Sequence, residues 1–335
     1  MTQAGTPPPL LHVEGLRTFF PIYGGVLQRV QGWVRAVDDV SFEVEAGRTL
    51  ALVGESGCGK TTVGRSCLRL VEPQQGSVRY EGVDLLRLGR AELQPYRRKL
   101  QIVFQDPNAS LDPRLRVRDA VAEGMEAFGI GDSDAERTER VAALFRRVQL
   151  DPAHMWRYPH EFSGGQRQRL CIARALAVEP RLLVCDEAVS ALDVSIQAQI
   201  LNLLRDLQDE LGLAYLFITH DLGVVRYLAH DVAVMYVGQI VERGLTERVF
   251  SDPRHPYTRA LLSAIPSVDP ARRAHRVRLQ GDVPSPANPP PGCRFHTRCP
   301  EAFARCREEA PSLEAVPEGE SRCFLANGPQ AAPTA

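Results

Sequence analysis

The chain of 335 residues is 44% hydrophobic and 24% charged, which fits a folded protein with one large domain and an extension, or two domains. Its formal net charge of −1 argues against a basic field that would attract DNA or RNA, so we expect no nucleic-acid partner. No basic region followed by an apolar run opens the sequence, and no apolar stretch approaches the ~18 residues of a membrane helix, so we expect neither a secretory signal nor a membrane span.

Short runs of alternating apolar and polar residues begin the chain. Residues 10–20 and 35–54 predict strands bounded by glycine. The second run leads into GESGCGKTT at residues 54–62 and then into a helical period, which is the order of strand, loop and helix in a phosphate loop. Residues 76–85 predict a further pair of strands.

The glycine-rich loop fits the pattern G-x-x-x-x-G-K-[ST] without a mismatch. Glycines let backbone N–H groups turn towards phosphate oxygens, and the helix that follows adds the positive end of its dipole. Lys60 is expected to reach the terminal phosphates and Thr61 to bind magnesium, whereas a plain glycine turn would need neither. The residues predicted to contact the nucleotide here are Gly54, Glu55, Ser56, Gly57, Cys58, Gly59, Lys60, Thr61 and Thr62.

From about residue 107 the apolar residues recur three and four apart, which predicts a helical subdomain over about residues 107–178. Near its end, in EFSGGQRQRL, Ser163 and Gln166 fit a capping box at the start of a helix. A capping box does not require the two glycines Gly164 and Gly165. Backbone N–H groups at the start of a helix that no side chain covers can bind an anion. Both interpretations stand, and the second gives the chain another half-site for phosphate.

Two apolar runs, at residues 181–193 and 214–222, end in charged residues, as buried parallel strands that deliver side chains to a site do. Asp186 is the expected second magnesium ligand. Glu187 could deprotonate a water for attack on the terminal phosphate, or simply favour the start of a helix. His220 ends the second run and is a further candidate for the site.

After about residue 251 proline and glycine become frequent, which predicts a separate, irregular unit. This segment contains four of the eight cysteines, Cys293, Cys299, Cys306 and Cys323. They could hold an iron–sulfur cluster or zinc, or remain free thiols, although they lack the close C-x-x-C pair usual in zinc modules. The other four are expected to be buried as small apolar residues: Cys58, Cys67, Cys171 and Cys185.

These motifs resemble, in order and context, those of the ATP-binding subunits of ABC transporters. The residues that carry the resemblance beyond the phosphate loop are Gln105 in IVFQDP, Ser163 to Gln166, Asp186 with Glu187, SALD at residues 190–193 and His220 in ITHD. The resemblance implies an α/β ATPase with a RecA-like core, an antiparallel β subdomain and a helical subdomain over residues 9–250, and a C-terminal extension over residues 251–335.

The same resemblance implies a role for each matched residue. Gln105 would link the nucleotide and its magnesium to the helical subdomain, Glu187 would be the base, and His220 would hold the terminal phosphate. Asp193 would face a partner subunit, and Phe20 would stack on adenine, with Phe19 or Tyr23 as alternatives because an inserted stretch follows. Residues 163–166 would close over ATP held by a second subunit, so that two half-sites make two whole sites.

Residues 104–114, 254–266 and 281–300 resemble more narrowly the ATP-binding subunits of oligopeptide, dipeptide and nickel importers. This implies a motor subunit peripheral to the cytoplasmic face of the membrane, with a second ATPase subunit (a paralogue or another copy), two transmembrane permease subunits and an extracytoplasmic solute-binding protein. It also implies a four-iron, four-sulfur cluster at the four cysteines. A nickel or other small-solute importer, a soluble non-transport ATPase and an ATP-binding regulatory module are the alternatives to a peptide importer.

Overall fold

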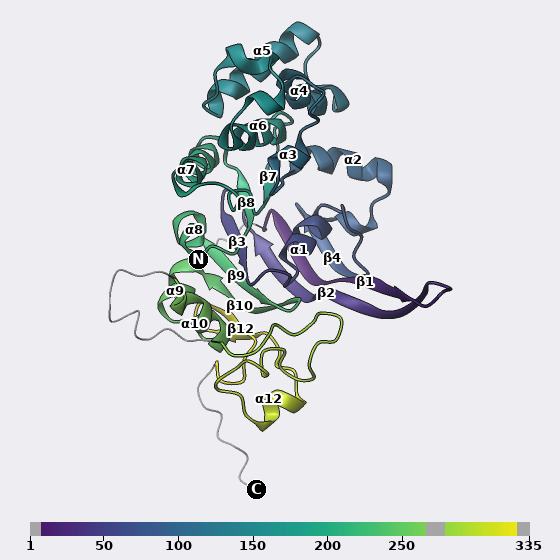
Figure 1. Cartoon of the computed structure of the whole chain (residues 1–335), viewed down its shortest axis with the longest axis vertical. Helices are drawn as coiled ribbons and strands as arrows, with labels where there is room; N and C mark the ends of the chain where they lie inside the picture. Colours follow the sequence, from purple (N-terminus) through teal and green to yellow (C-terminus); the bar gives the residue numbers. More distant parts are fainter. Residues whose placement is uncertain (1–7, 266–278, 327–335) are drawn as a thin grey trace, which may run out of the picture. The chain divides into compact units, whose positions relative to one another are not determined.

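The computed structural model describes residues 8–265 and 279–326 (Figure 1). The chain divides into two compact units, each of which combines strands and helices. Unit 1 comprises Met1–Glu43, Leu50–Leu86 and His220–Ala335, and unit 2 comprises Val44–Thr49 and Arg87–Thr219. The predicted α/β class is therefore confirmed. Within the described residues, no helix has both the length and the apolar character needed to span a bilayer.

Unit 1 contains an antiparallel sheet in the strand order β2-β1-β4-β5. Its strands are β1 (Leu11–Gly24), β2 (Arg29–Val44), β4 (Gln75–Tyr80) and β5 (Val83–Asp84), followed by the short 3-10 helix η1 (Leu85–Arg87). β1 and β4 pair with Leu11 opposite Tyr80 and Val13 opposite Val78, all of which are buried. The strand pair predicted at residues 76–85 is confirmed, but β1 and β2 extend through the stretch that the sequence suggested was an insertion.

Unit 1 contains a second group of strands in the order β11-β12-β10-β9-β3. They are β3 (Thr49–Val53), β9 (Asp231–Tyr236), β10 (Gln239–Leu245), β11 (Glu314–Val316) and β12 (Gly319–Ser321). β3 and β9 are parallel, and the remaining pairs are antiparallel. The phosphate-loop sequence directly follows β3, which is buried along its whole length.

The C-terminal extension is part of unit 1 and not a separate unit, although its residues 279–326 are mostly irregular, as its proline content suggested. Its strand β12 pairs with β10, and Phe295 belongs to a buried cluster with Val234, Tyr236 and Tyr257. Composition misses this because a few buried anchors suffice to attach a segment whose remaining residues are polar. The helices of unit 1 are α1 (Lys60–Cys67), α8 (Leu222–Leu228), α9 (Thr246–Ser251), α10 (Pro256–Ser263) and α12 (Ala304–Glu308).

Unit 2 contains three parallel strands, with β7 between β6 and β8. They are β6 (Leu100–Val103), β7 (Leu182–Asp186) and β8 (Ala214–Thr219). β7 and β8 are buried along their whole lengths, as continuous apolar runs in parallel sheets are. Asp186 therefore lies at the carboxyl end of the middle strand, opposite Ile218 of β8.

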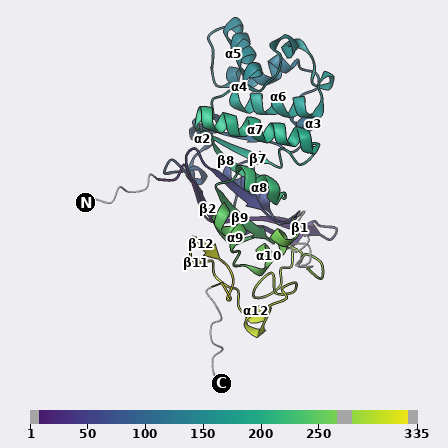
Figure 2. The ribbon, with the colours of Figure 1, turned by 90° about the vertical axis from the view of Figure 1, so that its left-hand side faces the viewer.

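The helices α4 and α5 pack on α6, and α6 also contacts α3 and α7 (Figure 2). The sequence sets these boundaries locally: Ser133 accepts a hydrogen bond from the Glu136 N–H at the start of α5, and Gly212 ends α7 in the left-handed conformation. The helices of unit 2 are α2 (Arg90–Lys99), α3 (Pro107–Ser110), α4 (Val117–Ala127), α5 (Asp134–Arg147), η2 (Pro152–Trp156), η3 (Pro159–Glu161), α6 (Gly164–Leu176) and α7 (Val194–Leu211). The predicted limits of the helical subdomain and of the extension stay predictions.

Candidate functional site

The phosphate loop needs glycine because its backbone passes close to other strands. A Cβ atom on Gly54 would lie 2.3 Å from the Met235 carbonyl oxygen, and one on Gly59 would lie 2.0 Å from that of Ala36. Both glycines also have positive φ angles, of 154° and 106°. The loop is thus fixed in a conformation that directs it into the start of α1, as a phosphate-binding loop requires.

Lys60 lies at the start of α1 with its side chain turned back into the loop. Its Nζ donates hydrogen bonds to the carbonyl oxygens of Gly54 at 2.8 Å and Glu55 at 3.1 Å, and the residue is only 4% exposed. A buried ammonium held by backbone carbonyls is a preformed positive centre. The arrangement therefore fits the capture of a phosphate group by this loop.

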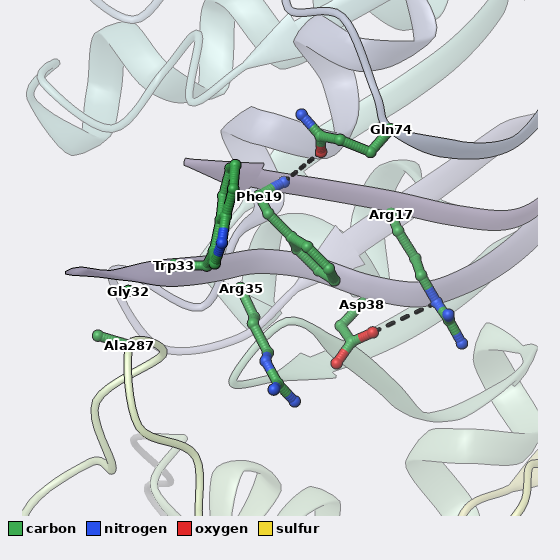
Figure 3. A pocket seen from close by; sticks show the side chains of 8 residues that line it. All are labelled: Arg17, Phe19, Gly32, Trp33, Arg35, Asp38, Gln74 and Ala287. Atoms are coloured by element: carbon green, nitrogen blue, oxygen red, sulfur yellow. Dashed lines mark hydrogen bonds and ion pairs between the residues drawn. The ribbon is translucent and has the colours of Figure 1, made fainter. Parts of the chain in front are cut away.

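A pocket of about 800 Å³ lies in unit 1 between β1, β2 and the extension (Figure 3). Aromatic, charged and amide side chains line it together, which is the mixture expected where a flat polar ring binds. Arg17 and Asp38 form an ion pair across it at 3.4 Å, and the side-chain oxygen of Gln74 accepts the Phe19 N–H at 2.6 Å. The lining residues are Arg17, Phe19, Gly32, Trp33, Arg35, Asp38, Gln74 and Ala287.

The pocket and the phosphate loop are joined through the backbone of Gly238. The Gly238 N–H donates to the Cys58 carbonyl at 2.9 Å, and its own carbonyl accepts the Asp38 N–H at 2.8 Å. Ala36, whose carbonyl lies against Gly59, belongs to the same strand as Trp33 and Arg35. A ring in the pocket and a phosphate chain on the loop would therefore lie beside the same strand.

Of the aromatic residues considered for the adenine ring, the alternative Phe19 lines this pocket and the first choice, Phe20, does not. Phe19 and Trp33 line the pocket, whereas Phe20, the next residue of the same strand, does not and is 40% exposed. Successive strand residues point to opposite faces, so adjacent phenylalanines cannot serve one ring. Trp33 was not anticipated because the sequence suggested an insertion there and residues 33–37 show no apolar–polar alternation; only the exposure of residues 31–36 alternates, as in a strand.

Gln105 and Glu187 meet in unit 2. The Gln105 side-chain amide donates a hydrogen bond to a Glu187 carboxylate oxygen at 3.1 Å. Glu187 follows Asp186 and has a φ angle of 49°, in the left-handed region that non-glycine residues rarely enter and that is over-represented at functional sites. Asp186 itself is 4% exposed at the end of β7. Two of the predicted site carboxylates are thus adjacent, and one is held by the predicted glutamine.

The Ser163 segment begins helix α6 with the predicted capping box. The Ser163 hydroxyl accepts from the Gln166 N–H at 3.3 Å, and the Gln166 side chain accepts from the Ser163 N–H at 2.9 Å. A Cβ atom on Gly165 would lie 2.5 Å from Ile196, so this glycine is needed for packing on α7. Gly164 has no such contact and is exposed with Ser163, which leaves this part of the helix start open to a ligand.

His220 and Asp193 complete the predicted set. His220 follows the last residue of β8 and is exposed. Asp193 is the exposed residue that precedes α7. Their roles stay predictions.

The four cysteines of the extension influence one another electrostatically. Burial chiefly raises the pKa of Cys293 to about 11, and nearby Cys306 and Cys323 raise it further. Burial likewise raises the pKa of Cys299 to about 12, with added contributions from Cys293 and Cys323. Among the described residues, however, no three His, Cys, Asp or Glu side chains are placed to ligate one metal ion, so the structure does not support the metal prediction. The other four cysteines are buried, as predicted.

Comparisons with known proteins identify the family. Residues 37–190 match the ABC transporter family, and residues 241–306 match the oligopeptide/dipeptide transporter C-terminal region. The chain is 52% identical over 323 residues to the probable peptide ABC transporter ATP-binding protein y4tS of Sinorhizobium fredii, a match covering 96% of this chain and 91% of the relative. It is also 55% identical over 278 residues to the glutathione import ATP-binding protein GsiA of Salmonella choleraesuis, covering 83% of this chain and 44% of that relative.

The fold agrees with this assignment. The dimeric structure of MJ0796, a bacterial ABC transporter cassette, matches with a TM-score of 0.62 and 25% identity, covering 70% of this chain and 98% of that chain. The chain therefore has the fold of an ABC ATPase cassette. The chain belongs to the ABC transporter family, as an ATP-binding protein that carries the oligopeptide/dipeptide transporter C-terminal region.

Proposed function

We propose that the chain is the ATP-hydrolysing motor subunit of a peptide importer. The contact between Gln105 and Glu187 is the observation that carries the proposal. A carboxylate immediately after the magnesium-binding aspartate can orient and deprotonate a water, and the glutamine amide holds that carboxylate in place. A protein that only bound ATP would have no use for this arrangement.

Each part of the site has a task in this proposal. The phosphate loop and Lys60 bind the β- and γ-phosphates, and Phe19 and Trp33 bind the adenine ring in the pocket. The Thr61 hydroxyl and the Asp186 carboxylate are hard oxygen ligands that fit Mg²⁺. Magnesium would neutralise charge on the phosphates, while Glu187 takes a proton from the attacking water and His220 donates to the γ-phosphate.

The exposed Ser163 and Gly164 suggest that the protein works as a head-to-tail dimer. Ser163 caps a 13-residue helix that begins at Gly164, and a phosphate bound at this helix start would gain from the helix dipole. We assign this helix start to the ATP of a second subunit, either a paralogue or another copy, with Asp193 facing the same partner. Hydrolysis would then release the pair and drive the movement.

Peptides are the substrate class that the relatives favour. y4tS is named a probable peptide ABC transporter ATP-binding protein, and GsiA is named a glutathione import ATP-binding protein; glutathione is itself a tripeptide. We propose two transmembrane permease subunits and an extracytoplasmic solute-binding protein as partners, with the chain peripheral at the cytoplasmic face of the membrane.

Reconstitution tests this function. Liposomes that contain the chain in complex with its permease subunits, supplied with the solute-binding protein, should take up labelled di- to pentapeptides only with Mg-ATP on the side of the chain. Uptake of labelled glutathione and of labelled nickel is measured in parallel for comparison. Uptake of nickel without peptide uptake would replace the substrate assignment, and ATP hydrolysis without any complex with permeases would overturn the importer.

We further propose that the four cysteines of the extension hold a four-iron, four-sulfur cluster. The Cys293 N–H donates to the Cys306 carbonyl at 2.8 Å, and this contact between two of the four cysteines supports the proposal. Each iron of such a cluster takes one thiolate, so its cysteines stand further apart than those around a single zinc ion.

A further inference from the structure

Glu55, the second residue of the phosphate loop, is held at both its backbone and its side chain by residues from the C-terminal part of the chain. Its N–H donates a hydrogen bond to the Tyr257 hydroxyl at 3.0 Å. Its carboxylate accepts from both terminal nitrogens of Arg298, at 2.7 and 3.2 Å. Its carbonyl oxygen in turn accepts from Lys60 at 3.1 Å. One residue thus connects the extension to the loop lysine.

The ion pair lies in surroundings that make it strong and rigid. The Arg298 side chain is only 8% exposed, against 29% for Glu55. The guanidinium lies 5.9 Å from the centre of the Tyr236 ring, and Tyr236, Tyr257 and Phe295 pack against one another with centroids 4.7 to 5.4 Å apart. A two-point pair of arginine with carboxylate fixes orientation as well as distance, and low exposure weakens the screening by water.

The same extension also contacts the pocket between β1 and β2 that is proposed to bind adenine. The Pro286 carbonyl accepts the Arg35 N–H at 2.9 Å, and Ala287 lines the pocket. Arg294 pairs with Asp38, another lining residue, and donates to the Val237 carbonyl at 2.5 Å. The extension therefore contacts the proposed nucleotide site at both its base end and its phosphate end.

We infer that the C-terminal extension is a working part of the nucleotide site and that Arg298 is a positioning residue, which sets the conformation of the phosphate loop through Glu55. Arg298 acts before chemistry: with the loop already ordered, ATP binds without the cost of ordering it. The inference rests on the proposed nucleotide site. It gives the extension a task in binding ATP that does not depend on whether its cysteines hold a metal.

The position of Arg298 in the sequence extends this argument. It directly precedes Cys299, and its own N–H donates to the Phe295 carbonyl at 3.0 Å in the turn that begins at Cys293. Cys293 and Cys299 both pack against the cluster that contains Tyr236 and Tyr257. A change in the conformation of this turn would therefore displace the guanidinium that holds Glu55.

Equilibrium binding of a fluorescent Mg-ATP analogue to the full chain tests the inference. Arg298→Ala and Glu55→Gln should each weaken binding on the order of 10-fold, and the double variant should be no weaker than either, because both remove the same interaction. Arg298→Lys, which keeps the charge but loses the two-point geometry, should lie between them and the wild type. Arg259→Ala is the matched control, since Arg259 pairs with Glu301 at 3.0 Å in the same region without touching the loop.

Melting temperatures without nucleotide separate positioning from mere stability. A structural role alone would lower the melting temperature of Arg298→Ala and leave the ATP affinity of the folded protein unchanged, which would overturn the inference. Equal losses of affinity in Arg259→Ala, or additive losses in the double variant, would overturn it as well. If Arg298→Ala does not fold, Arg298→Lys and Glu55→Gln carry the test. Failure of the wild type to bind ATP, or binding that survives Lys60→Ala, would instead refute the nucleotide site itself.

Discussion

The side-chain amide of Gln105 donates to the carboxylate of Glu187 across 3.1 Å, although the two residues are 82 positions apart in the chain. Gln105 follows β6 and Glu187 follows β7, and these neighbouring parallel strands end at the same edge. The fold of unit 2 therefore holds the proposed base and its orienting residue together before ATP arrives.

Replacing Glu187 with glutamine should abolish turnover but not binding. Glu187→Gln removes the group that accepts the proton of the attacking water, so we expect hydrolysis to fall by about 100-fold or more while Mg-ATP still binds. The measurement is phosphate release in the assembled complex. Glu210→Gln is the control, because Glu210 forms an exposed ion pair with Arg147 at 2.8 Å. Wild-type turnover in Glu187→Gln would refute the assignment.

Substitution of Ser163 should damage the opposite site. In Ser163→Arg the bulky cation covers the start of α6, so ATP binding to the same subunit should persist and hydrolysis should fail. In a homodimer, mixing this variant with Lys60→Ala restores one intact site per mixed dimer, because both defects then fall in the other site. Recovered activity on mixing supports the head-to-tail arrangement, whereas loss of ATP binding in Ser163→Arg alone would contradict it.

The lining of the proposed adenine pocket predicts which aromatic residues bind the adenine ring. Phe19→Ala and Trp33→Ala should each reduce ATP affinity by about 10-fold, since stacking on a base contributes ~1–3 kcal/mol per aromatic residue. Phe20→Ala should have little effect, because Phe20 is absent from the pocket lining. A loss confined to Phe20→Ala would restore the residue first expected from the resemblance.

His255 should make the extension sensitive to acid. Burial chiefly lowers its pKa from 6.5 to about 3, nearby Arg259 lowers it further, and a hydrogen bond with the Arg322 backbone opposes the shift. Between pH 3 and 6.5 the unfolded chain therefore binds a proton at His255 that the folded chain does not. The free energy of unfolding should decrease as the pH is lowered below 6.5, by up to about 1.4 kcal/mol per pH unit.

The opposite effect comes from Glu242, which accepts the His255 N–H at 2.9 Å. Burial raises the pKa of this carboxyl, so its contribution is present below its usual pKa and is lost as pH rises through the raised value. His255→Asn keeps a cap for the Tyr257 N–H and removes the imidazole. Its chemical unfolding should depend less on pH between 4 and 6.5 than that of the wild type, and an unchanged slope would contradict the assignment.

The four-cysteine site has a direct spectroscopic test. Protein purified without oxygen, with iron supplied, should be brown, absorb broadly near ~400 nm and contain iron and sulfide in about equal amounts. Cys293→Ser should bleach it and expose the extension to protease, because metal–thiolate bonds contribute folding free energy. Cys67→Ser, at a buried cysteine in α1, is the control that should leave the colour unchanged. Colourless protein that contains zinc or no metal would exclude the cluster.

Local signals were enough to predict much of the site. The phosphate loop, the strand that precedes it and the capping box at Ser163 follow from residues adjacent in the sequence, where glycine φ angles and side-chain caps act over a few positions. The buried run at residues 182–186 likewise identified its own terminal carboxylate. These features needed no tertiary information.

The rest depends on residues that come together only in the folded chain. Trp33 and Gln74 line one pocket from separate segments, and Arg298 reaches Glu55 from 243 positions away. Neither hydrophobic periodicity nor motif spacing predicts such pairs. In the sequence alone, Trp33 is an ordinary aromatic residue of a strand, Gln74 an amide in a loop and Arg298 a solvated arginine. The two glycines after Ser163 were both read as ligand-binding, whereas Gly165 is required by the packing of Ile196.

The pairing of β12 with β10 affects how the protein is made. An uncovered strand edge offers unpaired N–H and C=O groups to other chains, and β12 covers β10 in the described part of unit 1. On the ribosome β10 emerges well before residues 319–321, so a nascent chain carries an open edge until translation passes that point. A fragment released earlier would be prone to aggregation and degradation, which would keep incomplete subunits from competing for the partners of the intact protein.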